Sequence, residues 1–171
     1  MKPKEKIILY FTIFFISAAM LIGYSYYAEQ TEPYDFGEFT IDVPLGSKFK
    51  DVTSRYDSEN YNIGKAYICT DKDLTISIFD KHYIENTYEM NTGDKIDFGK
   101  SLLGHLHGEN KYKINESSEN LTFFILNHRV KGIIDTDIAG VYNDDDHLII
   151  VEGGDIEFIE KIANSIKIKN T

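Results

Sequence analysis

Hydrophobic positions are continuous near the start of the chain. Residues 7–28 form an apolar run without a charged side chain, and the tyrosines at its end suit a membrane–water interface. About 20 apolar residues span the hydrocarbon core of a bilayer when they form a helix. The run therefore predicts one N-terminal transmembrane helix that contacts the membrane through residues 7–27.

The charges on either side of this run predict its orientation. Three lysines precede it, whereas the next basic residue along the chain is Lys48. Because positively charged flanks stay in the cytoplasm, residues 1–28 are expected to form the cytoplasmic start and the anchor of a single-pass cell-membrane protein whose C-terminal domain lies outside. A cleaved signal peptide is the alternative, but cutting after Ala28 would place Tyr26 where a small residue is required.

Beyond the apolar run, short-range alternation becomes the main pattern. Residues 29–35 are polar and contain a proline, which predicts a linker. The remaining residues, 36–171, suffice for one extracytoplasmic domain with a substantial core. Most of this domain is predicted to consist of strands, because apolar and polar residues alternate in short runs. The strands are expected at residues 39–43, 67–70, 74–79, 112–114, 121–126, 130–136, 138–142 and 148–152.

Two segments of the domain have helical spacing. Asp94 can cap one helix, and Asp155 can cap a second. Gly99 and Gly104 lie within the first helix and are unfavourable there, and close packing on a sheet would explain them. The segment Phe123–Leu126 lacks polar alternation, which predicts a strand covered on both faces, with the last helix as the candidate cover. The order of these elements predicts an α+β fold, a mostly antiparallel β-sheet with helices packed on it.

Three segments of the outer domain resemble PsbP-like (Mog-type) domains. They are FGEFTIDVPLGS at residues 36–47, the predicted meander from Asn127 to Glu152, and FIEKIANSIKIK at residues 158–169. The chain is most similar to the small membrane-anchored versions that methanogenic archaea carry. The resemblance implies an antiparallel sheet packed between helices, used as a non-enzymatic accessory or binding domain, and it carries over no catalytic or metal-binding residue.

Charge narrows the class of partner. Beyond residue 28 the chain holds 27 acidic and 15 basic residues, a formal net charge of −12. Such a charge disfavours nucleic acid and anionic lipid head groups, and it favours cations or basic proteins. The alternative explanation is that acidic side chains simply keep an exposed domain soluble.

Asp144, Asp145 and Asp146, followed by His147, form the densest group of metal-ligand side chains in the sequence. Hard oxygen donors in a loop are the ligands that Ca²⁺ requires, so this group is the candidate metal site. Its spacing does not match an EF-hand, and the polar tip of a hairpin is the alternative explanation.

Three other groups could carry chemistry. On the predicted helix the side chains of His105 and His107 diverge by about 200°, which indicates surface histidines instead of a shared metal site. Asp135 and Asp137 share one face of a strand and could act as an acid–base pair, although solvent-facing carboxylates are the commoner arrangement. Cys69 is the single cysteine, and we expect a buried, unreactive thiol.

Tyrosines cluster between residues 56 and 88. A tyrosine at a surface offers contact area with a polar tip, so these side chains form the predicted interaction surface, although several could belong to the core. The cluster consists of Tyr56, Tyr61, Tyr67, Tyr83 and Tyr88, and the predicted interaction surface comprises all of these except Tyr67. Asn115 and Asn120 each begin a glycosylation sequon, which suits an exposed loop of a secreted domain.

Together these patterns predict a membrane-anchored extracytoplasmic accessory or interaction module of the cell envelope, non-enzymatic and without a cofactor. Its partner would be another envelope protein, and nucleic acid is not expected. The alternative function is an extracytoplasmic small-ligand or cation-binding domain that uses the Asp144–Asp146 loop or a tyrosine-lined cleft. A hydrolase that uses Asp135 and Asp137 is the least favoured hypothesis, because the sequence holds no recognisable hydrolase motif.

Overall fold

The computed structural model describes the backbone of residues 3–28, 30–56, 63–88, 94–107, 111–117, 119–130 and 133–169. Side chains are described over these ranges except at residues 3–9, 24–28, 55, 56, 63, 88, 111–117, 127–130 and 133–135.

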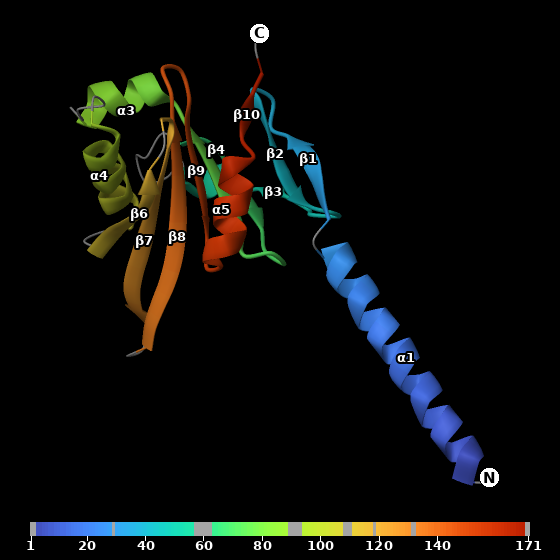
Figure 1. Ribbon diagram of the computed structural model, residues 1–171. Coiled ribbons are helices and arrows are strands. Elements are labelled where there is room, and N and C mark those ends of the chain that lie inside the picture. The colour runs from blue at the N-terminus through green and yellow to red at the C-terminus, as the bar shows by residue number, and fades with distance from the viewer. Residues whose placement is uncertain are drawn as a thin grey trace.

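Helices and strands alternate in blocks along the chain (Figure 1). The helices are α1 (Pro3–Ala28), α2 (Thr53–Tyr56), α3 (Lys81–Tyr88), α4 (Lys95–His107) and α5 (Ile156–Asn164). The strands are β1 (Thr31–Asp35), β2 (Phe39–Pro44), β3 (Lys50–Asp51), β4 (Ile63–Cys69), β5 (Leu74–Phe79), β6 (Lys111–Ser117), β7 (Leu121–Val130), β8 (Ile133–Asn143), β9 (Leu148–Gly153) and β10 (Lys167–Ile168).

The described strands form two antiparallel sheets. The smaller sheet has the order β1-β2-β10, and the larger has the order β3-β4-β5-β9-β8-β7-β6. The prediction of an α+β fold with a mostly antiparallel sheet is therefore confirmed.

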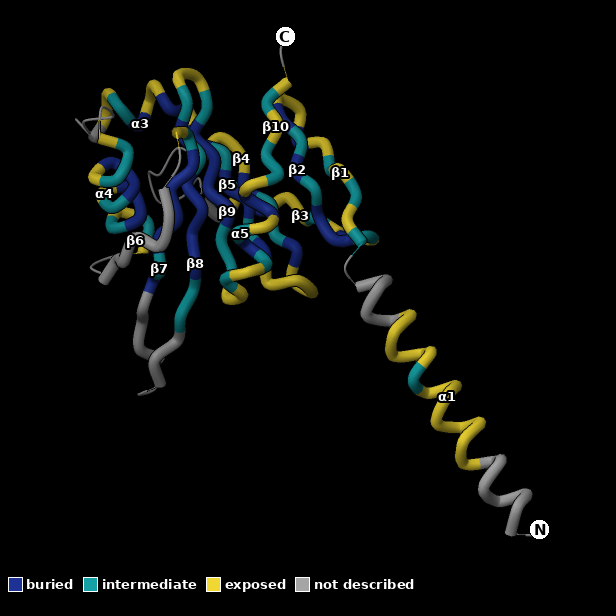
Figure 2. Tube along the Cα trace, viewed as in Figure 1, coloured by how far each residue is buried: buried dark blue, intermediate teal, exposed yellow. Residues whose placement is uncertain are grey.

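The larger sheet is covered on both faces, and β9 shows this most clearly. Ile149 and Val151 belong to one apolar cluster, whereas Leu148 and Ile150 belong to the other. Successive side chains of a strand point to opposite faces, so all four of these residues are buried. The smaller sheet and α5 lie on the first face, and α3 and α4 lie on the second (Figures 1 and 2).

Helix α4 begins and packs as predicted. Asp94 Oδ1 accepts hydrogen bonds from the backbone N–H groups of Ile96 (3.0 Å) and Asp97 (3.1 Å), which satisfies two donors of the first turn. Gly99 lies against β7, where a Cβ would stand 2.4 Å from Phe124 Cζ. The glycine therefore lets the helix approach the sheet closely, and Phe123–Leu126 is covered on both faces as expected.

Helix α5 covers the other face of β7 and β8. Asp155 caps it by accepting a hydrogen bond from the Phe158 N–H at 3.0 Å. Ile159 and Ile162 are fully buried, one helical turn apart. Each such side chain contributes about 1.5–3 kcal/mol through its removal from water, so this one apolar stripe fixes α5 on the sheet.

The predicted linker is wrong, because residues 31–35 form β1 instead of a tether. Thr31 pairs with Pro44, and Asp35 pairs with Thr40 on β2. The strand is polar because it lies at the edge of the smaller sheet, where only alternate residues are partly buried and a proline is tolerated. Tyr34 is one of these residues, and its ring packs 4.8 Å from that of Phe36.

The predicted break between residues 136 and 138 is also wrong. Strand β8 runs without interruption from Ile133 to Asn143, and Val130 belongs to the preceding strand, β7. Thr136 and Asp137 interrupt the apolar pattern, but their backbone groups stay in the ladder with β7. The polar residues Thr136 and Asp137 therefore indicate a change in what surrounds β8, and they do not indicate the end of the strand.

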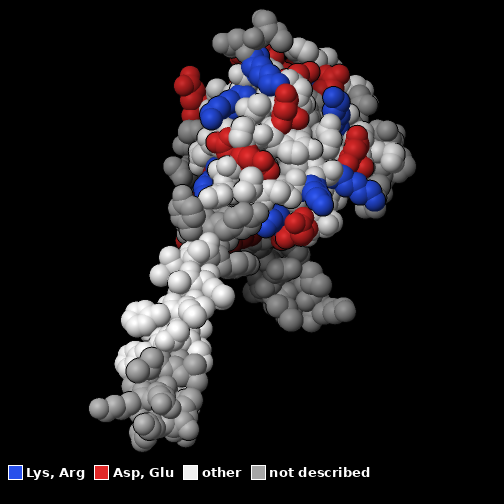
Figure 3. All heavy atoms as spheres, turned by 90° about the vertical axis from the view of Figure 1, so that its right-hand side faces the viewer, with Lys and Arg blue, Asp and Glu red and all other residues white. Residues whose placement is uncertain are grey.

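Helix α1 extends away from the domain (Figure 1). The side chains described in it are those of residues 10–23, and its large apolar residues are exposed, as Figure 2 shows. On the face seen in Figure 3, this part of the helix carries no charged residue, whereas Lys, Asp and Glu are interspersed over the domain. Among the described residues, no helix combines the length and the apolar character needed to cross a membrane.

Candidate functional site

Near the end of helix α4, the side chains on the covered face of the larger sheet change from apolar to acidic. Towards the middle of the face that α4 covers, β8 and β9 contribute Ala139 and Ile150, which are buried and apolar. On the same face, Asp137 lies two residues before Ala139 in β8, and Glu152 lies two residues after Ile150 in β9. Because side chains alternate with a period of two, these carboxylates lie on the α4 face beyond the apolar core.

The strand register brings the polar residues of this region together. Glu152 pairs with Thr75 on β5 and with Ala139 on β8, and Asp137 pairs with Leu126 on β7. Asp137 is therefore the diagonal neighbour of Glu152, within reach of a long side chain.

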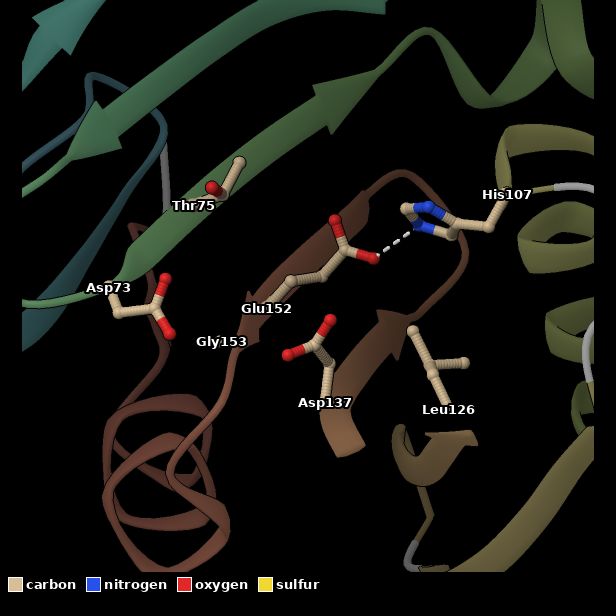
Figure 4. Close-up of a pocket in the computed structure, with 7 residues that line it drawn as sticks. All are labelled: Asp73, Thr75, His107, Leu126, Asp137, Glu152 and Gly153. Carbon is tan, nitrogen blue, oxygen red and sulfur yellow. Dashed lines mark hydrogen bonds and ion pairs between the residues drawn. The ribbon is translucent and has the colours of Figure 1, made fainter. Parts of the chain in front are cut away.

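A cavity of about 220 Å³ opens at this position, and we call it the acidic cavity. It is lined by Asp73, Thr75, His107, Leu126, Asp137, Glu152 and Gly153. In Figure 4 the three carboxylates reach the cavity from different elements: Asp73 from the turn between β4 and β5, Asp137 from β8 and Glu152 from β9.

His107, the last residue of α4, closes one side of the acidic cavity. Its Nε2 lies 2.7 Å from Glu152 Oε1, the interaction that is dashed in Figure 4. This hydrogen bond, together with the charges of Glu152 and Asp137, raises the pKa of His107, although burial of the ring acts in the opposite direction. A protonated imidazole also suits the negative end of the helix dipole.

The acidic cavity favours a positively charged occupant. One imidazole faces three carboxylates, and Asp73 is held in place by the Gly154 N–H, which donates to its Oδ2 at 3.0 Å. Among the described residues, no group of three or more His, Cys, Asp or Glu side chains is arranged to hold a metal ion. Carboxylates bind an ammonium or a guanidinium by charge-assisted hydrogen bonds, so the three that line the acidic cavity suit an organic cation.

At the predicted cation site of Asp144, Asp145 and Asp146, the first carboxylate is engaged within its own turn. Asp144 Oδ1 accepts hydrogen bonds from the N–H groups of Asp146 (3.0 Å) and His147 (2.7 Å), and its Oδ2 accepts one from the Tyr142 hydroxyl. Asp145 and Asp146 are exposed. The aspartate side chain thus organises the turn between β8 and β9, the alternative that the sequence left open.

This turn carries two shifted pKa values. Burial alone would raise the pKa of Asp144, but the hydrogen bonds from His147, Asp146 and Tyr142 outweigh it and lower the pKa. Burial, together with the hydrogen bond to Asp144, raises the pKa of Tyr142 to about 12. Near neutral pH the turn therefore holds an ionised aspartate beside a neutral tyrosine.

Most of the other predicted site residues lie where the structure describes no side chain. This applies to Tyr56, Tyr61, Tyr88, Asn115 and Asp135. Tyr83 is 37% exposed, and Asn120 is partly buried beside the turn after β8. The predicted tyrosine surface thus stays a prediction.

The structure agrees with the sequence-based predictions for His105, His107 and Cys69. The two histidines lie on α4, so no strand holds them on one face. Cys69 is buried, as expected; burial raises the pKa of its thiol, which donates to Asp71 Oδ1 at 3.2 Å.

Sequence reasoning missed Glu152, Asp73 and Thr75, and it considered Asp137 and His107 only in separate groups. A signal was present for Glu152: it continues the alternation of Leu148 and Ile150 but replaces the apolar residue with a carboxylate. Its meaning depends on strand register, which joins residues far apart in the chain.

No family model matches the chain, and no curated protein matches its sequence.

Proposed function

We propose that the protein is a membrane-anchored extracytoplasmic accessory module of the cell envelope, and that it binds a positively charged group of a partner protein. The single observation that carries the binding proposal is the acidic cavity, where Asp73, Asp137 and Glu152 meet beside His107. The resemblance to PsbP-like domains, which serve as accessory and binding domains, is part of the same proposal.

The anchor is proposed from α1 and the sequence around it. The helix has 26 residues and a length of about 39 Å; its described side chains, at residues 10–23, include no charged group, and the large apolar ones are exposed. A helix that is apolar all round requires burial in a protein or in a membrane. The three lysines before residue 7 favour an N-terminus in the cytoplasm.

Membrane fractionation tests the anchor. The full-length protein is expected to stay in the membrane pellet after high-salt and alkaline carbonate washes and to be released by detergent. A variant without residues 1–28 is expected in the soluble fraction. Release of the full-length protein by salt or carbonate alone would contradict the anchor.

A lysine or arginine side chain of a partner fits the acidic cavity in size and charge. The cavity is about 220 Å³, whereas a small-molecule site usually exceeds about 300 Å³. A single ammonium or guanidinium would contact Asp137 and Glu152, and the surrounding polar surface would form the rim of the interface. The net negative charge of the outer domain would guide a basic partner towards it.

The module is proposed to be non-enzymatic. Within the described lining of the acidic cavity, Thr75 supplies the hydroxyl group, and His107 bonds Glu152 instead of Thr75. An activated nucleophile requires its base within hydrogen-bond reach, and no such Thr75–His107 bond is formed among these residues.

A second candidate function, binding of a small organic cation, uses the same cavity. Titration of the full-length protein in detergent with a lysine-rich peptide, and separately with methylammonium, distinguishes the two candidates. Saturable binding of the peptide alone supports the partner module, and saturable binding of both probes supports the small-ligand site. Equal binding by a variant with Asp137→Asn and Glu152→Gln would contradict both.

A further inference from the structure

A second cavity, of about 360 Å³, shares no lining residue with the acidic cavity. It lies where the N-terminal ends of α3 and α4 meet the turns before β7 and after β8. We call it the lysine cavity, and it is lined by Lys81, Lys95, Glu119, Asn120, Asn143, Asp144 and Asp145.

Both lysines of this cavity occupy positions that a helix dipole disfavours. Lys81 is the first residue of α3 and Lys95 is the first residue of α4, so each ammonium lies near the positive end of a helix dipole. Lys81 is also only 9% exposed, and its Nζ lies 3.7 Å from Glu85 Oε1, an ion pair that offsets part of the cost of burying an ammonium. Cationic side chains kept at two such positions indicate a site for negative charge.

The bonds that hold the two ammonium groups leave them able to donate further. Lys81 Nζ donates to the backbone carbonyls of Asp144 and Asp145, and Lys95 Nζ donates to the carbonyl of Glu119 and, at 2.8 Å, to Asn120 Oδ1. An ammonium has three N–H donors, and among the described residues these bonds use two on each lysine.

Asn143 supplies the second, independent observation. It is only 4% exposed, and its backbone N–H donates to the Asn120 carbonyl at 2.8 Å. Its side-chain Oδ1 is buried and accepts no hydrogen bond within the described part of the chain. A buried acceptor without a partner is destabilising, so this oxygen requires a donor that the lysine cavity can receive.

We propose that the lysine cavity binds a small oxyanion that still carries a proton, of the monohydrogen phosphate kind. Lys81 and Lys95 hold its anionic oxygens, and Asn143 Oδ1 accepts the hydrogen bond from its hydroxyl group. The proposal does not depend on the acidic cavity, and the two can fail separately.

The neighbouring carboxylates are compatible with an anion here. The Asp144 carboxylate is engaged by Tyr142 and His147 within its own turn. Glu119 and Asp145 are exposed, so solvent and salt screen their charges. A metal cation is disfavoured, because the two ammonium groups would repel it.

The proton distinguishes phosphate from chemically similar anions, and this gives the test. Binding to the full-length protein in detergent is measured by titration calorimetry at a pH where phosphate is its monohydrogen dianion and methyl phosphate is fully deprotonated. Inorganic phosphate is expected to bind saturably. Sulfate and the methyl phosphate dianion, which have no hydroxyl to donate, are expected to bind at least about tenfold more weakly, because one hydrogen bond to a charged group is lost.

Two variants complete the test. Lys95→Gln keeps a donor for the Glu119 carbonyl but removes the charge, and it is expected to weaken binding of every oxyanion. Asn143→Leu removes the acceptor and is expected to abolish the preference for phosphate over sulfate without loss of thermal stability, because an unpartnered polar group is removed. Equal affinity for phosphate and sulfate in the unaltered protein, or no heat with either, would overturn the proposal, and the second result would leave water as the occupant.

Discussion

His107 at the end of α4 and Glu152 on β9 are joined by a contact of 2.7 Å between Nε2 and Oε1. The contact connects the helix to the sheet at the margin of the acidic cavity. The contact therefore belongs both to the fold and to the proposed binding site, and the protonation state of His107 affects both.

Stability is expected to depend on the protonation of His107. Because the folded state raises the pKa of His107, the contact contributes fully below the unfolded value of about 6.5, and the contribution is lost as pH rises through the raised folded value. The His107→Gln variant should therefore lower the melting temperature most in mildly acid solution and progressively less above it.

The matched control is His82→Gln. His82 also lies near a glutamate, with its Nδ1 3.6 Å from Glu85 Oε2, but its side chain is 77% exposed. Exposed pairs contribute little, so this variant should change the melting temperature by much less than His107→Gln. If the decrease in melting temperature caused by His107→Gln grew towards alkaline pH, it would contradict this prediction.

Gly99→Ala is expected to destabilise the protein although alanine favours a helix by about 1 kcal/mol. The new Cβ would stand 2.4 Å from Phe124 Cζ, and overpacking of a core costs roughly 1–3 kcal/mol. Urea denaturation measures the change. In a Phe124→Leu background the same substitution should cost clearly less, and equal costs in the two backgrounds would show that the ring is not the obstacle.

Asp144→Ala is expected to lower the free energy of unfolding by roughly 2 kcal/mol, because several hydrogen bonds to one carboxylate are lost. Asp145→Ala and Asp146→Ala are the controls and should change it by no more than about 0.5 kcal/mol. Since folding lowers the pKa of Asp144, its contribution is present above the ordinary aspartate pKa and is lost as pH falls through the lowered value. Thermal melts of the three variants between acid and neutral pH check both statements.

Asp155→Ala is expected to cost about 1 kcal/mol, the usual effect of removing a helix cap. The carboxylate oxygen accepts from the Phe158 N–H, and an asparagine keeps that acceptor. Asp155→Asn should therefore retain most of the stability in urea denaturation. If both variants lost the same amount, charge and not capping would be responsible.

The elements that the sequence predicted correctly are those set by local rules. Asp94 and Asp155 were identified as caps because the residues after them have helical spacing, and both caps form. Phe123 and Phe124 were expected to be covered on both faces, and they belong to different apolar clusters. In each case the deciding information lies within a few residues.

The features that escaped prediction depend on pairing between distant residues. Thr31–Asp35 has no apolar run of its own and is a strand only because β2 offers it an edge. The acidic cavity likewise requires pairing among β5, β9 and β8. This register places Thr75, Glu152 and Asp137 on one face of the sheet, the face against which α4 ends. No local pattern around His107 indicates that Glu152, in a distant part of the chain, will contact it.

The central proposal is that a basic group of a partner protein enters the acidic cavity. Carbodiimide cross-linking of the full-length protein in its native membrane, read by mass spectrometry, tests it directly, because this reagent joins a carboxylate to an adjacent amine. We expect a reproducible partner whose lysines are joined to Asp73, Asp137 or Glu152. The variant with Asp137→Asn and Glu152→Gln should lose the partner, and Asp145→Asn with Asp146→Asn should retain it. Undiminished cross-linking of the same partner to the cavity variant would contradict the account.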